Sequence, residues 1–210
     1  MLPIGKMYYD NFHFNILLPD LQYHGKSEGK SIRMGWLDRL DILQWIDVAN
    51  NLWKSNTMIL HGVSMGGATV MMTSGEELPK EVKAIVDDCG YTSVKDQFTK
   101  ELKEDFGMPK HPIIDVASIV TKWRFKWNFD EASAVNQVAK CKLPMLFIHG
   151  DSDDYVPTSM VYELYEAKQT GSKDLLITEG TAHAKSFLNH PQIYESKIRE
   201  FFLKNSVIEE

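Results

Sequence analysis

A serine framed by glycines is the first feature of this sequence that could do chemistry. Residues 61–67 read HGVSMGG and follow the apolar run 58–60 directly, which puts Ser64 at the centre of a Gly-x-Ser-x-Gly pattern. A serine and several glycines contribute little to a buried strand. On a sharp strand-to-helix turn, the serine hydroxyl would instead be lifted above the sheet, and the flanking glycines would be needed because side chains collide there. The pattern therefore predicts a nucleophile at Ser64, at a helix amino end that favours developing negative charge.

A serine nucleophile needs a base that accepts its proton and a third group that orients the base. In a strand-turn-helix site of this kind the chain order is serine, then an acid, then a histidine. Two histidines, His183 and His190, follow the acidic loop at residues 151–154. His183 comes just after the last predicted strand and is the predicted base. His190 stands at the start of the last predicted helix and is the alternative.

The acid is harder to choose, because five aspartates are candidates. Three share the loop after one predicted strand and two end another strand: Asp151, Asp153, Asp154, Asp87 and Asp88. Each could instead be a solvated carboxylate or a turn residue whose side chain bonds nearby backbone amides, which is the usual role of Asp in loops. Spacing alone leaves all five open.

These residues require a sheet that brings several strand ends together. Apolar runs alternate with helical patterns, which predicts parallel strands joined by crossover helices. The runs show little polar alternation, as expected for a sheet covered on both faces. Predicted strands lie at residues 14–18, 58–63, 82–86, 145–149 and 175–178, and predicted helices lie at 37–52, around 161–165 and at 193–202.

Residues 89–142 interrupt this alternation, because they contain helical patterns and no convincing strand. We predict a helical cap here, inserted in a single domain that spans residues 1–210. Ligands of open α/β sheets bind at the carboxyl ends of the strands, where the cap would lie. Trp123, Phe125 and Trp127 are therefore candidate substrate-binding residues. The alternative is that these aromatic side chains pack the cap onto the sheet.

Four longer segments match a known pattern. They read LLPDLQYHGKSEG, HGVSMGG, IHGDSDDYVP and GTAHA, in that order along nearly the whole chain. With them the chain resembles the α/β-hydrolases, and more closely a group of bacterial serine hydrolases with esterase-like and aminopeptidase-like members. The resemblance implies Ser64 as nucleophile, His183 as base and Asp153 as acid. It also implies the Met65 backbone N–H as one oxyanion donor.

The resemblance further implies earlier strands and a His-Gly loop that donates a second oxyanion N–H. The sequence starts with what looks like the helix after that loop. We therefore predict an N-terminally shortened α/β-hydrolase fold, a mostly parallel central sheet flanked by helices, with a gap between residues 14–18 and 58–63 that must close or leave sheet edges exposed. Removal of one oxyanion donor costs about 10²- to 10³-fold in rate, so impaired activity is expected.

The predicted function is hydrolysis of carboxylic esters through an acyl-serine intermediate, with no metal or organic cofactor. One alternative is an aminopeptidase or amidase with the same triad, for which Glu28, Asp87 or Asp88 could anchor the amino group of the substrate. The other alternative is a truncated, non-catalytic hydrolase-like protein.

Composition limits the partners. Lys and Arg number 23 against 29 Asp and Glu, and the formal charge of −6 disfavours binding to nucleic acid. No apolar run approaches the roughly 20 residues that a bilayer requires, and no secretory signal pattern is seen, so we predict a cytoplasmic protein with no membrane partner. Cys89 and Cys141 are predicted to be small buried residues, with neither a disulfide nor a metal site. The expected partner is a small ester or amide substrate.

Overall fold

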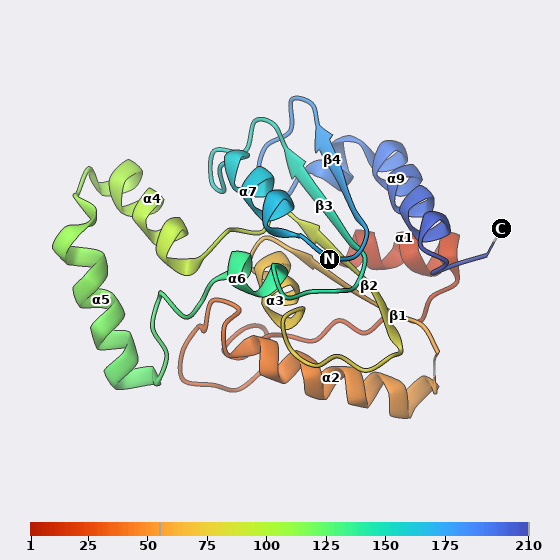
Figure 1. The fold of residues 1–210 in the computed structure, drawn as a ribbon, viewed down its shortest axis with the longest axis horizontal. Coiled ribbons are helices and arrows are strands. Elements are labelled where there is room, and N and C mark those ends of the chain that lie inside the picture. Colours follow the sequence, from red (N-terminus) through yellow and green to blue (C-terminus); the bar gives the residue numbers. More distant parts are fainter. Residues whose placement is uncertain (55, 210) are drawn as a thin grey trace.

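A four-stranded parallel sheet forms the centre of the computed structural model, which describes residues 1–54 and 56–209 (Figure 1). Each strand pairs with the next one along the chain, in the order β1-β2-β3-β4. The strands are β1 (Met58–Val63), β2 (Val82–Asp88), β3 (Met145–Gly150) and β4 (Lys173–Thr178). The predicted α/β class and parallel sheet are confirmed.

Helices connect the strands and cover the sheet on both faces (Figure 1). The helices predicted from apolar periodicity correspond to α2, α7 and α9. Among the described residues, none of the helices has both the length and the apolar character that crossing a membrane requires. The helices are α1 (Leu2–Phe12), α2 (Asp38–Trp53), α3 (Met65–Thr73), α4 (Val94–Phe106), α5 (Lys110–Phe125), α6 (Ala134–Val138), α7 (Ser159–Ala167), α8 (Ser186–Asn189) and α9 (Pro191–Lys204).

The two faces of the sheet have separate cores, because successive side chains of a strand point to opposite faces. On one face, Ile85 and Phe147 pack in a cluster with residues of α3, α6 and α7. On the other face, Val86 and Leu146 pack in a cluster with residues of α1 and α9. Both faces are buried, and this is why the strands appear in the sequence as continuous apolar runs.

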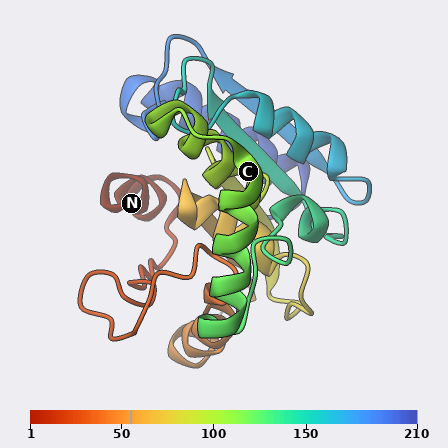
Figure 2. The same ribbon diagram turned by 90° about the vertical axis from the view of Figure 1, so that its left-hand side faces the viewer.

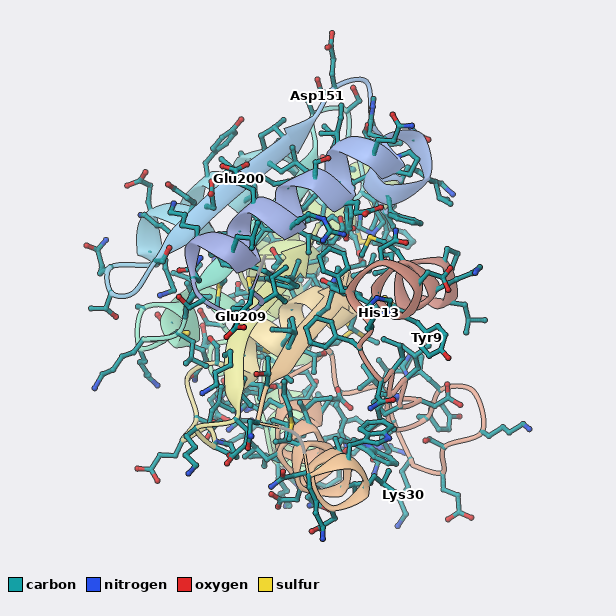
Figure 3. All side chains as sticks on the ribbon, turned by 90° about the vertical axis from the view of Figure 1, so that its right-hand side faces the viewer. Tyr9, His13, Lys30, Asp151, Glu200 and Glu209 are labelled. Carbon is teal, nitrogen blue, oxygen red and sulfur yellow. The ribbon has the colours of Figure 1, made fainter. Side chains whose placement is uncertain are left out.

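The predicted strand at residues 14–18 is wrong, since this segment lies outside the sheet. Within the described part of the chain, β1 is an edge strand that pairs with β2 alone. A cleft of about 1020 Å³ is lined by residues 13–21, by α1 and α2, and by β1. Figure 3 views the molecule from this side, with His13 marking the end of α1. Residues 14–18 lie beside the cleft, and no strand of the described residues is next to them to pair with. The apolar run therefore forms no strand.

Helices α4 and α5 project from one side of the molecule, away from the sheet (Figures 1 and 2). The chain enters α4 after the end of β2, and Ser93 caps this helix by accepting a hydrogen bond at 3.0 Å from the Asp96 backbone N–H. The shorter helix α6 instead packs against α3 and α7. Residues 89–142 therefore contain both a projecting helix pair and a helix that belongs to the layer on the sheet.

Candidate active site

Ser64 occupies the turn between β1 and α3. Its φ of 56° and ψ of −119° lie in a region that residues with a side chain rarely adopt. Such backbone strain costs about 1–3 kcal/mol and persists only where the surrounding structure enforces it. Here the Ser64 N–H donates to the Asp88 carbonyl at 2.8 Å, and the Ser64 carbonyl accepts from the Ala68 N–H at 2.9 Å. The strained turn is thus held from the neighbouring strand and from the following helix.

The two glycines of the Gly-x-Ser-x-Gly pattern differ in their surroundings. A Cβ atom on Gly62 would lie 2.0 Å from the Gly66 carbonyl oxygen, because the turn folds the start of α3 back onto β1. A Cβ atom on Gly66 would meet no atom of the described residues within 4 Å. The expectation that crowding requires both glycines is therefore right for Gly62 and wrong for Gly66.

This difference predicts opposite outcomes for two alanine variants. G62A is expected to lower the free energy of unfolding by about 1–3 kcal/mol, because the backbone of the turn must open to admit the methyl group. G66A, inside α3, is expected to be neutral or stabilising by up to about 1 kcal/mol, because alanine favours helices over glycine. Urea unfolding of both variants measures the two effects, and equal losses would contradict the geometry.

The structure brings together the serine, the histidine and one of the five aspartates. The Ser64 hydroxyl lies 2.7 Å from Nε2 of His183, and Nδ1 of His183 lies 2.7 Å from Oδ2 of Asp153. When Nδ1 carries the proton and donates it to the carboxylate, Nε2 is left free to accept the serine proton. One hydrogen-bonded line therefore runs from the hydroxyl through the imidazole to the carboxylate.

Asp153 is held as a buried, ionised acceptor. Its Oδ1 accepts from the backbone N–H groups of Tyr155 at 3.0 Å and Val156 at 2.9 Å. Burial alone would raise the pKa of Asp153, but hydrogen bonds from His149, His183 and the Val156 amide outweigh burial and hold that pKa well below its usual range. The carboxylate thus stays charged at neutral pH.

The rival loop residues lie elsewhere. Asp151 is exposed at the outer end of the loop and accepts hydrogen bonds from the Ser152 hydroxyl and the Thr181 backbone N–H (Figure 3). Asp154 is exposed as well. His190 is the N-cap residue of α9, and its Nε2 lies 2.9 Å from the Glu179 carbonyl oxygen. These contacts give the rival residues roles in turns and caps.

Met65 is the first residue of α3, so its N–H is one of the amides that a helix leaves without an intrahelical acceptor. The cap aromatics have different environments. Trp123 is 76% exposed on α5, Phe125 is half-buried, and Trp127 is buried with its ring 5.9 Å from that of Phe129. Trp127 therefore packs in the core, whereas Trp123 faces solvent.

Comparison with known proteins places this chain in a family. The sequence profile of the prolyl oligopeptidase family matches residues 33–207. The chain belongs to the prolyl oligopeptidase family. It is 30% identical over 189 residues to the uncharacterized protein YqkD of Bacillus subtilis (strain 168), a match that covers 90% of this chain and 62% of YqkD. The chain thus spans about three fifths of the length of that relative.

Solved structures of α/β-hydrolases share the fold of this prolyl oligopeptidase family member. The esterase Pf2001 of Pyrococcus furiosus superposes with a TM-score of 0.67 at 24% identity, over 88% of this chain and 68% of the esterase. The acylaminoacyl peptidase of Pyrococcus horikoshii superposes with a TM-score of 0.64 at 19% identity, over 88% of this chain and 32% of the peptidase. The resemblance to the α/β-hydrolases is confirmed at the level of fold.

Two further carboxyl groups lie at the end of β2, next to the turn that carries Ser64. Asp87 and Asp88 are both buried, and each has one side-chain oxygen without a partner among the described residues. Burial is the main cause that raises the pKa of Asp87 to about 8, and burial likewise raises that of Asp88 to about 6, against a lowering hydrogen bond from Tyr194. Asp87 is therefore mostly protonated at neutral pH.

The raised pKa of Asp87 predicts how stability depends on pH. A carboxyl whose pKa is higher in the folded state contributes stability below its unfolded pKa, and this contribution is lost as pH rises through about 8. D87N keeps an acceptor for the Gly90 N–H, which lies 3.0 Å from Oδ1, and cannot ionise. Its melting temperature should exceed that of the parent protein by about 2–8 °C at pH 8 and match it near pH 4. The same difference at both pH values would contradict this account.

A buried polar network joins α1 and α9 near the site. The sequence analysis did not predict it. The Tyr194 hydroxyl donates to Oδ2 of Asp88 at 2.9 Å and lies 3.0 Å from Nε2 of His61, whose Nδ1 lies 2.9 Å from the Tyr8 hydroxyl. Burial lowers the pKa of His61 to about 3, so the ring is neutral. These contacts fit a hydrogen-bonded residue that packs between the two helices. No local pattern could pair Tyr8 with Tyr194.

Cys89, Asp153 and His183 are the one group among the described residues with donor atoms close enough to share a metal ion, within 4.8 Å of one another. Asp153 and His183 already bind each other, so an ion would have to displace the proton between them. Burial, followed by the nearby carboxylates, raises the pKa of the Cys89 thiol and keeps it protonated, which makes it a poor ligand. The donor set therefore fits a proton-transfer site better than a metal site.

Proposed function

We propose that this chain is a serine hydrolase that cleaves carboxylic esters through an acyl intermediate on Ser64. The observation that carries the proposal is the pair of 2.7 Å contacts linking the Ser64 hydroxyl to His183 and His183 to Asp153. The strained backbone of Ser64 supports it, because strain of this kind concentrates at functional residues. Membership of the prolyl oligopeptidase family agrees with this chemistry.

In the first half of the proposed reaction, His183 Nε2 takes the hydroxyl proton as Ser64 Oγ bonds to the carbonyl carbon of the ester. The carbonyl oxygen becomes an oxyanion, which the Met65 N–H and the amino end of α3 stabilise. The ionised Asp153 stabilises the imidazolium that forms. Collapse of the intermediate breaks the bond to the alcohol, and the alcohol leaves with the proton from Nε2.

In the second half, a water molecule takes the place of the alcohol. His183 Nε2 removes a proton from the water as its oxygen bonds to the acyl carbon. The second tetrahedral intermediate then expels Ser64 Oγ, which recovers its proton from the imidazolium. The products are a carboxylic acid and an alcohol, and the three side chains return to their starting state. No step requires a metal or an organic cofactor.

An ester is favoured over the substrate of an aminopeptidase because most of the carboxylates that could anchor an amino group are out of reach. Two of the three candidate anchors for an amino group, Asp87 and Asp88, are buried and cannot reach a substrate. The third, Glu28, is exposed in the loop before α2. The fold neighbours include a protein named as an esterase and another named as an acylaminoacyl peptidase, so both reactions occur on this fold.

The projecting pair of helices is proposed to act as a cap over the substrate, as expected for residues 89–142. Of the three cap aromatics, Trp123 is the one whose exposed ring is available to an apolar substrate. Phe125 is half-buried and packs against the core cluster, and Trp127 would act by anchoring the cap to the core. We further propose that the substrate is a small molecule and that the protein does not bind nucleic acid. Its proposed location is the cytoplasm.

Labelling with a fluorophosphonate tests the serine chemistry, and paired substrates test the specificity. The folded chain should take one label, which peptide mapping should place on Ser64. Hydrolysis of a p-nitrophenyl acetate ester should exceed that of an aminoacyl p-nitroanilide in kcat/KM. A faster anilide reaction would favour the aminopeptidase.

A non-catalytic hydrolase-like protein is the second candidate, and the cleft beside β1 favours it. That cleft reaches Val63 and Gly66, which flank the turn carrying the nucleophile. A second N–H donor to the oxyanion is expected at this position. The cleft leaves open space there, and without that donor the oxyanion would be less stabilised. A chain that is folded by near-UV circular dichroism and takes no label at Ser64 would establish this second candidate.

A further inference from the structure

The line of hydrogen-bonded side chains does not end at Asp153. His149, the next-to-last residue of β3, has a fully buried side chain whose Nε2 lies 3.3 Å from Oδ2 of Asp153. The same Nε2 lies 2.9 Å from the Val156 carbonyl oxygen, which can only accept. Nε2 of His149 therefore carries a proton, shared between that carbonyl and the carboxylate. Oδ2 of Asp153 thus receives N–H groups from two histidines, His183 and His149.

The groups around His149 place it between the carboxylate and the core. From β2, Asp87 lies on the same face as His149, because Asp87 pairs with Phe147 and side chains alternate along β3. Asp88 interacts with His149 through its charge from the same strand, and helix α7 contributes Val161 and Leu164 to this core cluster, with Tyr165 packed against it. Burial opposes a charge on His149, but the hydrogen bonds to Asp153 and Val156 outweigh burial and raise its pKa.

His183 and the buried Cys89 thiol also lie close to the carboxylate, with their donor atoms within 4.8 Å of it. Cys89 is kept protonated, so it adds no charge to this group. Nδ1 of His149 and Oδ2 of Asp87 are both buried without a partner among the described residues. Asp87 interacts with His149 through its charge from the neighbouring strand.

We propose that His149 is a positioning residue that holds Asp153 from the core side and sets how strongly this carboxylate retains the proton on His183. The proposal rests on the proposed function, since it concerns the same site. A carboxylate that accepts a second N–H has its charge spread over both bonds and attracts the His183 proton less. Loss of the His149 N–H should therefore strengthen the attraction of Asp153 for the His183 proton, and this change should appear in the pH dependence of the serine reaction.

Two variants of nearly the same size separate the hydrogen bond from packing. H149M fills the space without a donor, whereas H149Q keeps an N–H group near the position of Nε2. The rate of fluorophosphonate labelling of Ser64 is measured between about pH 5 and pH 9. For H149M, the midpoint of the acid limb should move up by about 0.5–1 pH unit, so labelling near pH 6 falls about 3- to 10-fold while the alkaline plateau stays within about threefold. H149Q should keep the midpoint of the parent protein.

Near-UV circular dichroism at each pH gives the folded fraction, and the labelling rate is expressed per folded protein, so partial unfolding of H149M does not imitate this result. An unchanged midpoint in H149M, or the same shift in both variants, would overturn the proposal. Failure of the proposed function would look different, since the parent protein itself would then take no label.

The proton NMR resonance of the His183 Nδ1–H gives a readout that needs no reaction. It is assigned by its loss in H183A. It should move further downfield in H149M, because a carboxylate with one donor fewer forms a stronger bond to His183. No movement would overturn the positioning role even in a chain without activity.

Discussion

S64A is expected to reduce ester hydrolysis by about 10⁴- to 10⁶-fold and to abolish fluorophosphonate labelling. The reason is that the variant retains His183 and Asp153 but has no oxygen 2.7 Å from Nε2 that could form the acyl intermediate. The fold should be retained, because the Ser64 backbone makes the contacts that fix the turn. Initial rates with a p-nitrophenyl ester and gel fluorescence of the labelled protein measure both losses.

Ser152 provides the matched control for this variant. It is an exposed serine in the loop that also carries Asp153, and its hydroxyl donates to Asp151 at 2.9 Å. S152A is expected to retain activity within about twofold, as is usual for surface substitutions. Ester hydrolysis by S64A at the parental rate would show that another group performs the reaction.

D153N is expected to lower kcat by about 10⁴-fold with little change in the position of the side chains. The amide keeps Oδ1 as the acceptor for the Tyr155 and Val156 N–H groups, so the loop is held as before. Its NH₂ group, however, donates to Nδ1 of His183 and forces the ring proton onto Nε2. An imidazole protonated at Nε2 cannot accept the proton of Ser64.

D151N tests whether the loss of activity in D153N depends on which aspartate of the loop is changed. Asp151 lies two residues before Asp153 in the same acidic stretch. Its carboxylate is exposed and bonds only Ser152 and Thr181 among the described residues. We expect D151N to keep kcat within about threefold. If D151N lost as much activity as D153N, general loss of negative charge in this loop would explain both results.

The sequence by itself predicts the elements and the order of the reactive residues along the chain. Apolar runs covered on both faces indicate parallel strands, and four of the five predicted strands are present. The Gly-x-Ser-x-Gly pattern predicts the turn, since a positive φ at Ser64 and the close approach at Gly62 both follow from a tight strand-to-helix connection. These features depend on residues next to one another, so local patterns suffice to find them.

The fifth predicted strand shows the limit of local patterns. Residues 14–18 have the apolar character of a strand, but a strand forms only beside a partner, and here the neighbouring space is a cleft. The expected crowding at Gly66 is a second example. The motif does not show which atoms surround a given glycine, and at Gly66 there are none among the described residues within reach of a Cβ atom.

Which aspartate lies next to His183 also depended on the tertiary structure. The residues alone left five aspartates open, and resemblance to the α/β-hydrolases pointed to Asp153. The folded chain brings Asp153 within 2.7 Å of a histidine 30 residues away, and that histidine within 2.7 Å of a serine 119 residues away. The 3.3 Å distance between His149 and Asp153 is likewise visible only in the folded chain. Distances between segments so far apart arise from how helices and strands pack, and no local pattern encodes them.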